Sequence, residues 1–306
     1  MFAIYDIGTN TIDFVLVDLK HSTNTFNLLA EETVQIKLGE GSSISKILQQ
    51  SAIERCVSQL NNLKEKYKKH TISNHIAIGT AAIRNAKNKI EFLNIIKDKC
   101  DINIEVISGE KEAELIFEGI KFAVKNRIKK NSLIIDIGGG SVEFIITNFE
   151  QIHFKQSIDI GAIQLWETFN FSDPIKIKEE EVVKNEIYKT CDRVFHQLEL
   201  FKVRNIIGAA GCFDTFNALL SISELKPLQK FSSHEILSIC DNLIKSTSIE
   251  RENNKQIPSL RKNYIVPAAI LIKTILENYP FEDFYTSNFS LREGVVSKLL
   301  SDFKLL

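Results

Sequence analysis

The sequence predicts an α/β protein built from two similar halves. Strand-like apolar runs alternate with amphipathic helical runs along the chain, the order expected of sheets flanked by helices. Residues 6–17 also recur as a pattern at residues 136–147, each reading as Asp, Ile, glycine turn, hydroxyl, carboxylate and apolar strand. At 306 residues the chain is long enough for two domains of ordinary size.

Composition narrows the class of protein. Apolar residues make up 44% and charged residues 25% of the chain, with a net charge of −1, so a globular protein without bulk attraction to nucleic acid is expected. The sequence shows no basic leader and no apolar run of about 18 residues, so neither a signal peptide nor a membrane span is expected. The five scattered cysteines lack a Cys-x-x-Cys pair and predict reduced thiols in a cytoplasmic protein.

The elements of the first half follow from the spacing of apolar residues. Two strand runs around Gly8 predict a β-hairpin, and apolar residues three or four positions apart after Ser51 predict a helix. Ser108 is a suitable N-cap for a helix that runs to about Arg127. Strands are predicted at 2–6, 11–19, 29–37, 75–80 and 102–107, and helices at 51–68, around 90–96, and 109–127.

A polar stretch near residues 125–131 predicts the domain boundary, which gives domains of residues 1–124 and 125–306. Beyond it the strand and hairpin pattern starts again, and residues 205–211 repeat the run from a strand into glycines. Strands are predicted from 132, after the triple glycine, at 152–158 and at 284–286, and helices at 175–200, 213–220, 233–247, 264–278 and 292–300.

The two glycine turns are the first candidates for chemistry. Glycine-rich turns expose backbone N–H groups that bind phosphate oxygens, and the missing Cβ permits close approach. Alternatively, each turn only connects two strands, but two such turns in the same context favour phosphate binding. The candidate phosphate-binding residues are Gly8, Thr9, Asn10 and Thr11, and Gly138, Gly139, Gly140 and Ser141.

Two aspartates end the strands that lead into these turns. A carboxylate there is costly to bury without a partner, and Mg²⁺ is a natural partner beside phosphate. For Asp6, a metal and the N–H groups of its own turn are equally supported as partners. For Asp136 the pattern favours a metal, with Glu143 as a second ligand or as a strand residue that faces solvent. Asp13 occupies the place of Glu143 in the first half.

A helical carboxylate and an arginine complete the candidate set. Glu112 lies in the first turn of its predicted helix, where the helix dipole favours negative charge, and it could take a proton from a water as general base. First-turn acids are common on helices, and Glu110 and Glu114 compete for this role. Arg84, after a strand and a turn, could clamp phosphate oxygens or lie on a helix surface.

In this order, the motifs resemble those of the exopolyphosphatase/guanosine pentaphosphate phosphohydrolase (Ppx/GppA) family in its short two-domain form. The resemblance covers nearly the whole chain and rests on residues 6–11, 79–86, 107–113, 136–141, 208–211 and 291–294. It implies two actin-like (ribonuclease H-like) domains, each with a mixed five-stranded sheet flanked by helices, and a cleft between them. It also implies hydrolysis of a terminal phosphoanhydride with Mg²⁺ in that cleft.

The resemblance implies individual roles as well. The catalytic Glu of the Ser-Gly-x-x-Glu-Ala motif falls on Glu112, and the Arg of the Gly-Thr-x-x-x-Arg motif falls on Arg84. The metal-linked carboxylates fall on Asp136 and Glu143. The chain departs from the common family pattern at Lys111, Glu114, Cys212, Phe213 and Ser290.

The predicted function is that of a Mg²⁺-dependent exopolyphosphatase that removes the terminal phosphate of inorganic polyphosphate by means of a water activated by Glu112. Hydrolysis of guanosine pentaphosphate would use the same mechanism on another substrate. Alternatives from other classes are a non-catalytic protein that binds phosphate or a nucleotide, and a kinase-like phosphotransferase. Helices of the second domain could pair two subunits as a homodimer, whereas neither nucleic acid nor a membrane is an expected partner.

Overall fold

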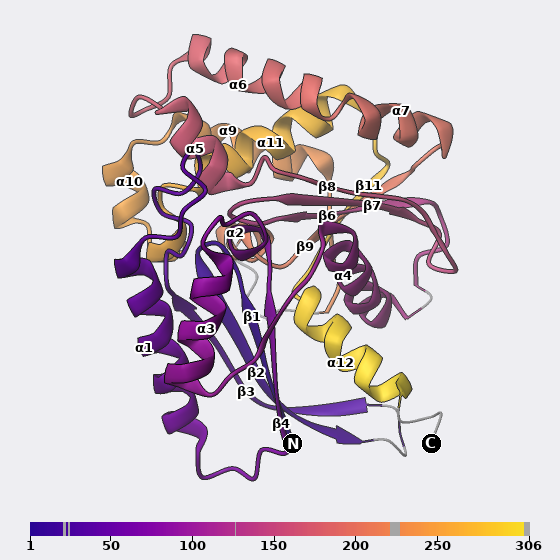
Figure 1. The fold of residues 1–306 in the computed structure, drawn as a ribbon. Helices are drawn as coiled ribbons and strands as arrows, with labels where there is room; N and C mark the ends of the chain where they lie inside the picture. The colour runs from indigo at the N-terminus through magenta and orange to yellow at the C-terminus, as the bar shows by residue number, and fades with distance from the viewer. Residues whose placement is uncertain (21–22, 24, 126, 221–226, 303–306) are drawn as a thin grey trace. The chain divides into compact units, whose positions relative to one another are not determined.

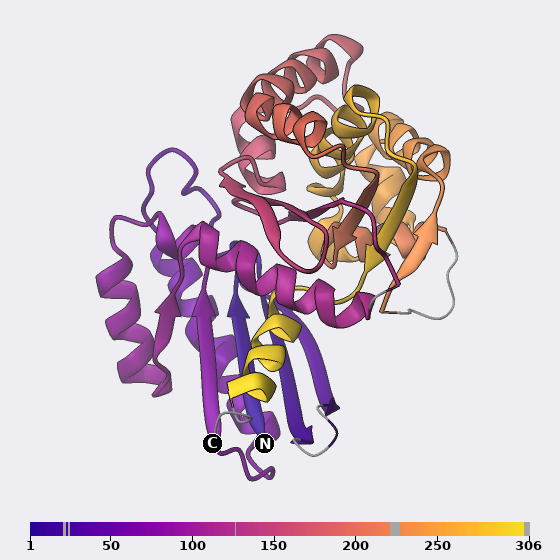
Figure 2. The same ribbon diagram turned by 90° about the vertical axis from the view of Figure 1, so that its right-hand side faces the viewer.

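The computed structural model describes residues 1–20, 23, 25–125, 127–220 and 227–302, and the chain divides into two compact units. Unit 1 comprises Met1–Gly119 with Leu291–Leu306, and unit 2 comprises Ile120–Ser290. Figures 1 and 2 show that each unit has a β-sheet flanked by helices. The α/β class is therefore confirmed, and each unit is described by itself below.

Unit 1 contains the elements β1 (Phe2–Ile7), β2 (Thr11–Lys20), β3 (Thr25–Gln35), α1 (Gln50–Tyr67), β4 (Asn74–Gly79), α2 (Ala81–Arg84), α3 (Lys89–Cys100), β5 (Ile104–Val106), the first part of α4 (Gly109–Val124), and α12 (Leu291–Asp302). Its five-stranded sheet has the order β3-β2-β1-β4-β5. β1 and β2 form the predicted antiparallel hairpin, while β4 and β5 continue the sheet in parallel.

The core of unit 1 follows from the alternation of side chains in β1 and β2. One face of these strands packs against α1 and α3, and full burial of each large apolar side chain contributes about 1.5–3 kcal/mol. The strand residues in this core are Ala3, Tyr5, Ile7, Ile12, Phe14 and Leu16. Helix α12 packs on β1 and β2, and Figure 1 shows it on the side of the sheet opposite α1.

The ends of two elements differ from the predicted boundaries. β3 ends at Gln35 because the N–H groups of Ile36 and Lys37 turn away to the carbonyl of Asn10, 2.9 Å from each nitrogen. α4 ends at Val124 because Lys125 adopts a left-handed φ of 45°, a common way for a helix to stop.

The last helix belongs to unit 1, whereas the sequence placed it in the second domain. Arg292 of α12 donates from Nη2 to Oε1 of Glu31 in β3 at 2.7 Å, and Gly294 packs directly on the backbone of Leu115 in α4. The division between the units also falls after Gly119, inside α4, rather than after residue 124. The apolar stripe of α4 continues past Gly119, so the amino-acid composition does not indicate a boundary between units there.

Unit 2 contains the end of α4, then β6 (Ser132–Ile137), β7 (Val142–Thr147), β8 (Ile152–Ile158), α5 (Ala162–Phe169), α6 (Ile177–Thr190), α7 (Asp192–Leu200), β9 (Asn205–Ala209), α8 (Cys212–Leu219), β10 (Gln229–Phe231), α9 (Ser233–Lys245), α10 (Ser248–Asn253), the 3₁₀ helix η1 (Ser259–Arg261), α11 (Ile265–Asn278) and β11 (Asp283–Ser287). Its sheet order is β10-β11-β9-β6-β7-β8.

The two sheets share one topology. β6 and β7 form an antiparallel hairpin like β1 and β2, β8 extends it as β3 does, and β9 and β11 continue in parallel like β4 and β5. The second sheet has six strands where five were predicted, because the short β10 pairs antiparallel with the edge strand β11. Helices α5 and α10 were also not predicted.

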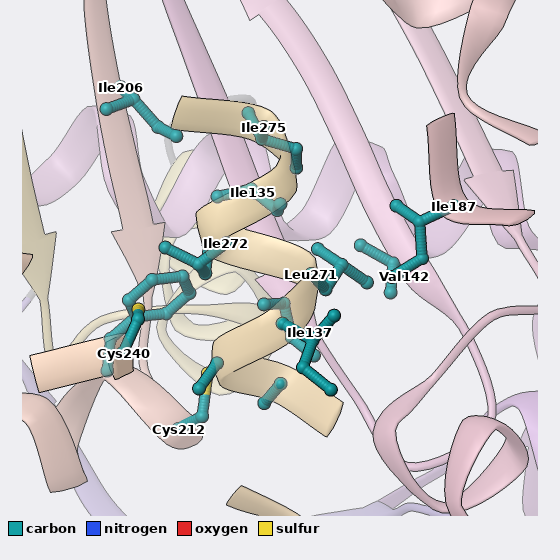
Figure 3. Packing of buried hydrophobic residues seen from close by; sticks show 14 of the residues in the cluster. Ile135, Ile137, Val142, Ile187, Ile206, Cys212, Cys240, Leu271, Ile272 and Ile275 are labelled. Carbon is teal, nitrogen blue, oxygen red and sulfur yellow. The ribbon is translucent and has the colours of Figure 1, made fainter. Parts of the chain in front are cut away.

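The core of unit 2 is organised around α11. Residues 265–272 of this helix are apolar and buried on all sides, as expected of a helix inside a core. Figure 3 shows Leu271, Ile272 and Ile275 of α11 packed among the apolar side chains of the sheet, including Ile135 and Ile206. Among the described residues, none of the helices combines the length and apolar character needed to span a bilayer.

The contact between α12 and α4 yields a stability prediction. A Cβ on Gly294 would lie 1.8 Å from the carbonyl oxygen of Leu115. Gly294→Ala should therefore destabilise the protein by about 1–3 kcal/mol, even though alanine raises helix propensity by about 1 kcal/mol. Ser297→Ala on the same helix is the control and should leave the urea midpoint almost unchanged. A Gly294→Ala variant as stable as the parent would show that α12 is not seated as described.

Candidate active site

The two predicted catalytic residues, Arg84 and Glu112, form an ion pair in unit 1. Nη1 of Arg84 lies 2.7 Å from Oε2 of Glu112, and the side chains are only 18% and 10% exposed. The same Nη1 donates to the carbonyl of Ile107 at 3.2 Å. A charge-assisted hydrogen bond in a largely buried setting is short and strong, so the guanidinium fixes the carboxylate in place and offsets its charge.

Local structure places both side chains. Glu112 lies in the first turn of α4, where its N–H donates to the carbonyl of Ser108 at 2.9 Å, and the Ser108 hydroxyl caps the N–H of Lys111 at 3.2 Å. This confirms the predicted N-cap. Arg84 ends α2, the single helical turn after β4, and the Thr80 N–H that starts this turn donates to the carbonyl of Ile7 at 3.2 Å. The β4–α2 connection is therefore fixed to the end of β1.

The first predicted phosphate turn lies between β1 and β2. It is closed by a hydrogen bond of 2.9 Å from the N–H of Gly8 to the carbonyl of Thr11. The carbonyls of Thr9 and Asn10 are both taken by the segment after β3, since the N–H of Gly39 donates to Thr9 at 2.8 Å. The turn is therefore held by the protein from its carbonyl side.

The second turn, between β6 and β7, has the same construction. The N–H of Gly138 donates to the carbonyl of Ser141 at 3.0 Å. Its carbonyls accept hydrogen bonds from the start of α5: Ala162 to Gly138, Ile163 and Gln164 to Gly139, and Gly161 to Gly140, at 2.9–3.3 Å. For the N–H groups of Gly139 and Gly140, no acceptor is found in the part of the chain that the structure describes.

The candidate metal carboxylates fall into two pairs. Asp136 lies opposite Glu143 across the β6–β7 hairpin, as Asp6 lies opposite Asp13 in unit 1, and directly opposed residues share one face of a sheet. Oε1 of Glu143 accepts from the hydroxyls of Ser141 at 2.8 Å and Ser157 at 2.7 Å. Because Glu143 is only 2% exposed, the alternative of a solvent-facing strand residue is wrong.

The donor set fits a metal shared with phosphate rather than a closed protein site. Asp136 and Glu143 supply two carboxylates, and Mg²⁺ commonly takes one or two of these with substrate phosphate and water. Asp6 belongs to unit 1, so the three candidate ligands are not in one unit. Within the described ranges, His, Cys, Asp and Glu do not gather in groups of three or more that could hold a metal.

Several contacts near these sites were not predicted from the sequence. Ser290, noted only as a departure from the family pattern, donates a short hydrogen bond to Oδ2 of Asp136, and Ser157 and Thr33 donate to Glu143 and Asp13 from neighbouring strands. Lone serines and threonines carry no sequence signal for such pairing. Gly161 was missed because α5 itself was missed.

Cys212, a departure from the family pattern, is buried at the start of α8. Burial raises the pKa of its thiol, with the nearby charge of Arg261 opposing this shift and that of Asp136 adding to it. A neutral buried thiol is a weak nucleophile, so Cys212 packs in the core shown in Figure 3 rather than reacting.

Comparison with known proteins defines the class. An exopolyphosphatase from Cytophaga hutchinsonii has a crystal structure that matches this fold with a TM-score of 0.93 and 30% identity over 98% of each chain. The bifunctional 3-dehydroquinate synthase/phosphatase of Fusobacterium nucleatum is 31% identical over 90% of this chain, which spans 43% of that protein. A putative exopolyphosphatase of Haemophilus influenzae is 24% identical over 99% of this chain and 92% of its own length.

The fold is thus the predicted one, with two actin-like units built on mixed sheets. The model described as the Ppx/GppA phosphatase family matches residues 16–303, and this chain belongs to that family. It is therefore a member of a family of hydrolases that act on phosphoanhydride bonds.

The strength of the Arg84–Glu112 pair is open to measurement by a double-mutant cycle. Each alanine variant leaves the opposite charge without its partner, whereas the double variant removes both. We expect a coupling free energy of about 0.5–3 kcal/mol from urea unfolding of the four proteins. A coupling within error of zero would mean that the two side chains do not interact in solution.

Proposed function

We propose that this protein is an exopolyphosphatase, which hydrolyses the terminal phosphoanhydride of inorganic polyphosphate with Glu112 as general base. The observation that carries the proposal is the buried carboxylate of Glu112, held at 2.7 Å by Arg84 at the start of α4. The 30% identity to an exopolyphosphatase over 98% of both chains supports this substrate.

In the proposed reaction Glu112 accepts a proton from a water as the water oxygen attacks the terminal phosphorus. The new P–O bond replaces the bond to the bridging oxygen, which leaves with the shortened polyphosphate. Arg84 can bind Glu112 and a phosphate group at the same time. Its Nη1 donates to Glu112, and the other N–H groups of the rigid, planar guanidinium can donate to a phosphate oxygen. Such catalysis depends mainly on positioning and on electrostatics.

The glycine turns would bind phosphate oxygens through backbone N–H groups, with the hydroxyls of Thr9 and Ser141 beside them. Asp136 and Glu143 would hold Mg²⁺, which offsets phosphate charge when bound. We also propose a cytoplasmic location, since all five cysteines are free and buried, as in proteins of reducing compartments.

Replacing the general base gives the first functional prediction. Glu112→Gln should retain the fold and lower kcat for phosphate release from polyphosphate by about 10²–10⁴-fold. Glu110→Gln is the matched control, because Glu110 lies in the same helical turn but is exposed, and it should behave like the parent. Near-parental turnover by Glu112→Gln would exclude the assigned role.

The assay should compare polyphosphate, guanosine pentaphosphate and ATP as substrates. Faster release from guanosine pentaphosphate would reassign the substrate and keep the mechanism. Binding of these compounds without any phosphate release would instead identify a non-catalytic binding protein.

Removing a candidate metal ligand gives the second functional prediction. Asp136→Asn should raise the Mg²⁺ concentration needed for half-maximal activity at least about tenfold, since loss of a charged ligand should cost at least about 1.4 kcal/mol of binding free energy. Titration with Mn²⁺, followed by its electron paramagnetic resonance signal, measures metal binding without turnover. Asp192→Asn, an exposed aspartate of α7, is the control. Equal metal affinity in the two variants would argue against Asp136 as a ligand.

A further inference from the structure

The two phosphate turns share a feature that the sequence did not predict. Each turn is held from its carbonyl side by a later segment of its own unit: residues 36–39 hold the β1–β2 turn, and residues 161–164 hold the β6–β7 turn. The two segments differ in structure, since the first is a loop and the second begins α5. The same arrangement is therefore reached in two ways.

The planarity of the peptide bond gives this feature its consequence. In a trans peptide, the carbonyl of one residue and the N–H of the next point in opposite directions. Fixing the carbonyls of Gly138, Gly139 and Gly140 against α5 therefore directs the N–H groups of Gly139, Gly140 and Ser141 away from α5. Fixing the carbonyls of Thr9 and Asn10 likewise directs the N–H groups of Asn10 and Thr11 away from residues 36–39.

Close approach of each segment requires a glycine. A Cβ on Gly161 would lie 2.5 Å from the carbonyl carbon and oxygen of Gly139 and from the nitrogen of Gly140. A Cβ on Gly39 would lie 2.3 Å from Cγ2 of Thr9. Real Cβ contacts are not found this close, so an alanine at Gly161 must displace the backbone of the second turn, and an alanine at Gly39 must displace Thr9 in the first.

We propose that Gly39 and Gly161 are positioning residues for phosphate binding. Because these glycines lack a Cβ, the backbone behind each turn can donate hydrogen bonds to the turn carbonyls. The turn N–H groups then point toward bound phosphate, and the carbonyl oxygens point away from the anion. The ligand class is a condensed phosphate or the phosphate chain of a nucleotide. This inference rests on the phosphate-binding role proposed above for the turns.

The test measures binding of inorganic tripolyphosphate by isothermal titration calorimetry in the presence of EDTA, so that turnover does not interfere. Gly161→Ala and Gly39→Ala should each weaken binding about 10–100-fold, as expected from losing one or two hydrogen bonds to a charged group. In activity assays KM should rise far more than kcat falls. Thr168→Ala, at the exposed end of α5, is the control and should bind like the parent.

A rescue experiment separates positioning from simple misfolding. Serine lacks the Cγ2 that Gly39→Ala would strike, and the other contacts of the new Cβ, to the Thr9 carbonyl oxygen and Cβ, lie at 3.5 and 3.6 Å. The double variant Thr9→Ser/Gly39→Ala should therefore bind tripolyphosphate as tightly as Thr9→Ser alone. Failure of this rescue, or parental binding by both glycine variants, would overturn the inference.

The same data distinguish this inference from the proposed activity. If the parent binds tripolyphosphate, loses that affinity in the glycine variants and yet releases no phosphate with Mg²⁺, the positioning role stands and the hydrolytic function fails. If Gly161→Ala lowers the melting temperature strongly, the positioning role is judged from tripolyphosphate binding by Gly39→Ala and by Thr9→Ser/Gly39→Ala. If the parent itself does not bind tripolyphosphate, both proposals fall together.

Discussion

A peptide plane carries its N–H and C=O groups on opposite sides, and the candidate site depends on that constraint. A flexible glycine turn would present donors and acceptors alike to an anion. Here the backbone carbonyls of the turns accept hydrogen bonds from residues 36–39 and 161–164, which directs the N–H groups of the same peptides to the other side of each turn. This order is present in the backbone without a ligand, so phosphate binding as proposed would cost less conformational entropy.

The repeated unit is the whole hairpin and its neighbouring strand, rather than the glycines alone. In both units a carboxylate on the second strand of the hairpin accepts from a hydroxyl in the turn and from a hydroxyl on the third strand: Thr11 and Thr33 to Asp13, and Ser141 and Ser157 to Glu143. These bonds tie three strands together at the level of the turn. Cross-strand polar pairs of this kind stabilise a sheet modestly, but here they also fix where the turn hydroxyls lie.

The sequence predicted much of this because the relevant signals are local. Most strand runs, the Ser108 N-cap and the two glycine turns depend on residues close together in the chain and lie where they were expected, whereas the bounds of β3 differ and β10 was not predicted. The features that were missed depend on distant residues. Helix α12 packs in unit 1 because Gly294 allows close contact with the backbone of Leu115. The second turn is hydrogen-bonded to the segment that begins with Gly161, some twenty residues downstream. An isolated glycine in the sequence does not show which backbone it approaches.

The asymmetry between the units points to where the chemistry would occur. In unit 1 the turn after β4 leads into α2, which ends with Arg84 held on Glu112. The corresponding turn after β9 in unit 2 leads into α8 through Gly211, with a φ of 56°, and then Cys212 and Phe213, both buried in the apolar core. The hairpin is duplicated, but the helix that follows differs between the units, since α2 leads to Arg84 whereas α8 begins with Cys212 and Phe213 in the apolar core. The duplicated hairpin and the single Arg84–Glu112 ion pair agree with the proposed role of Glu112, which assigns water activation to unit 1.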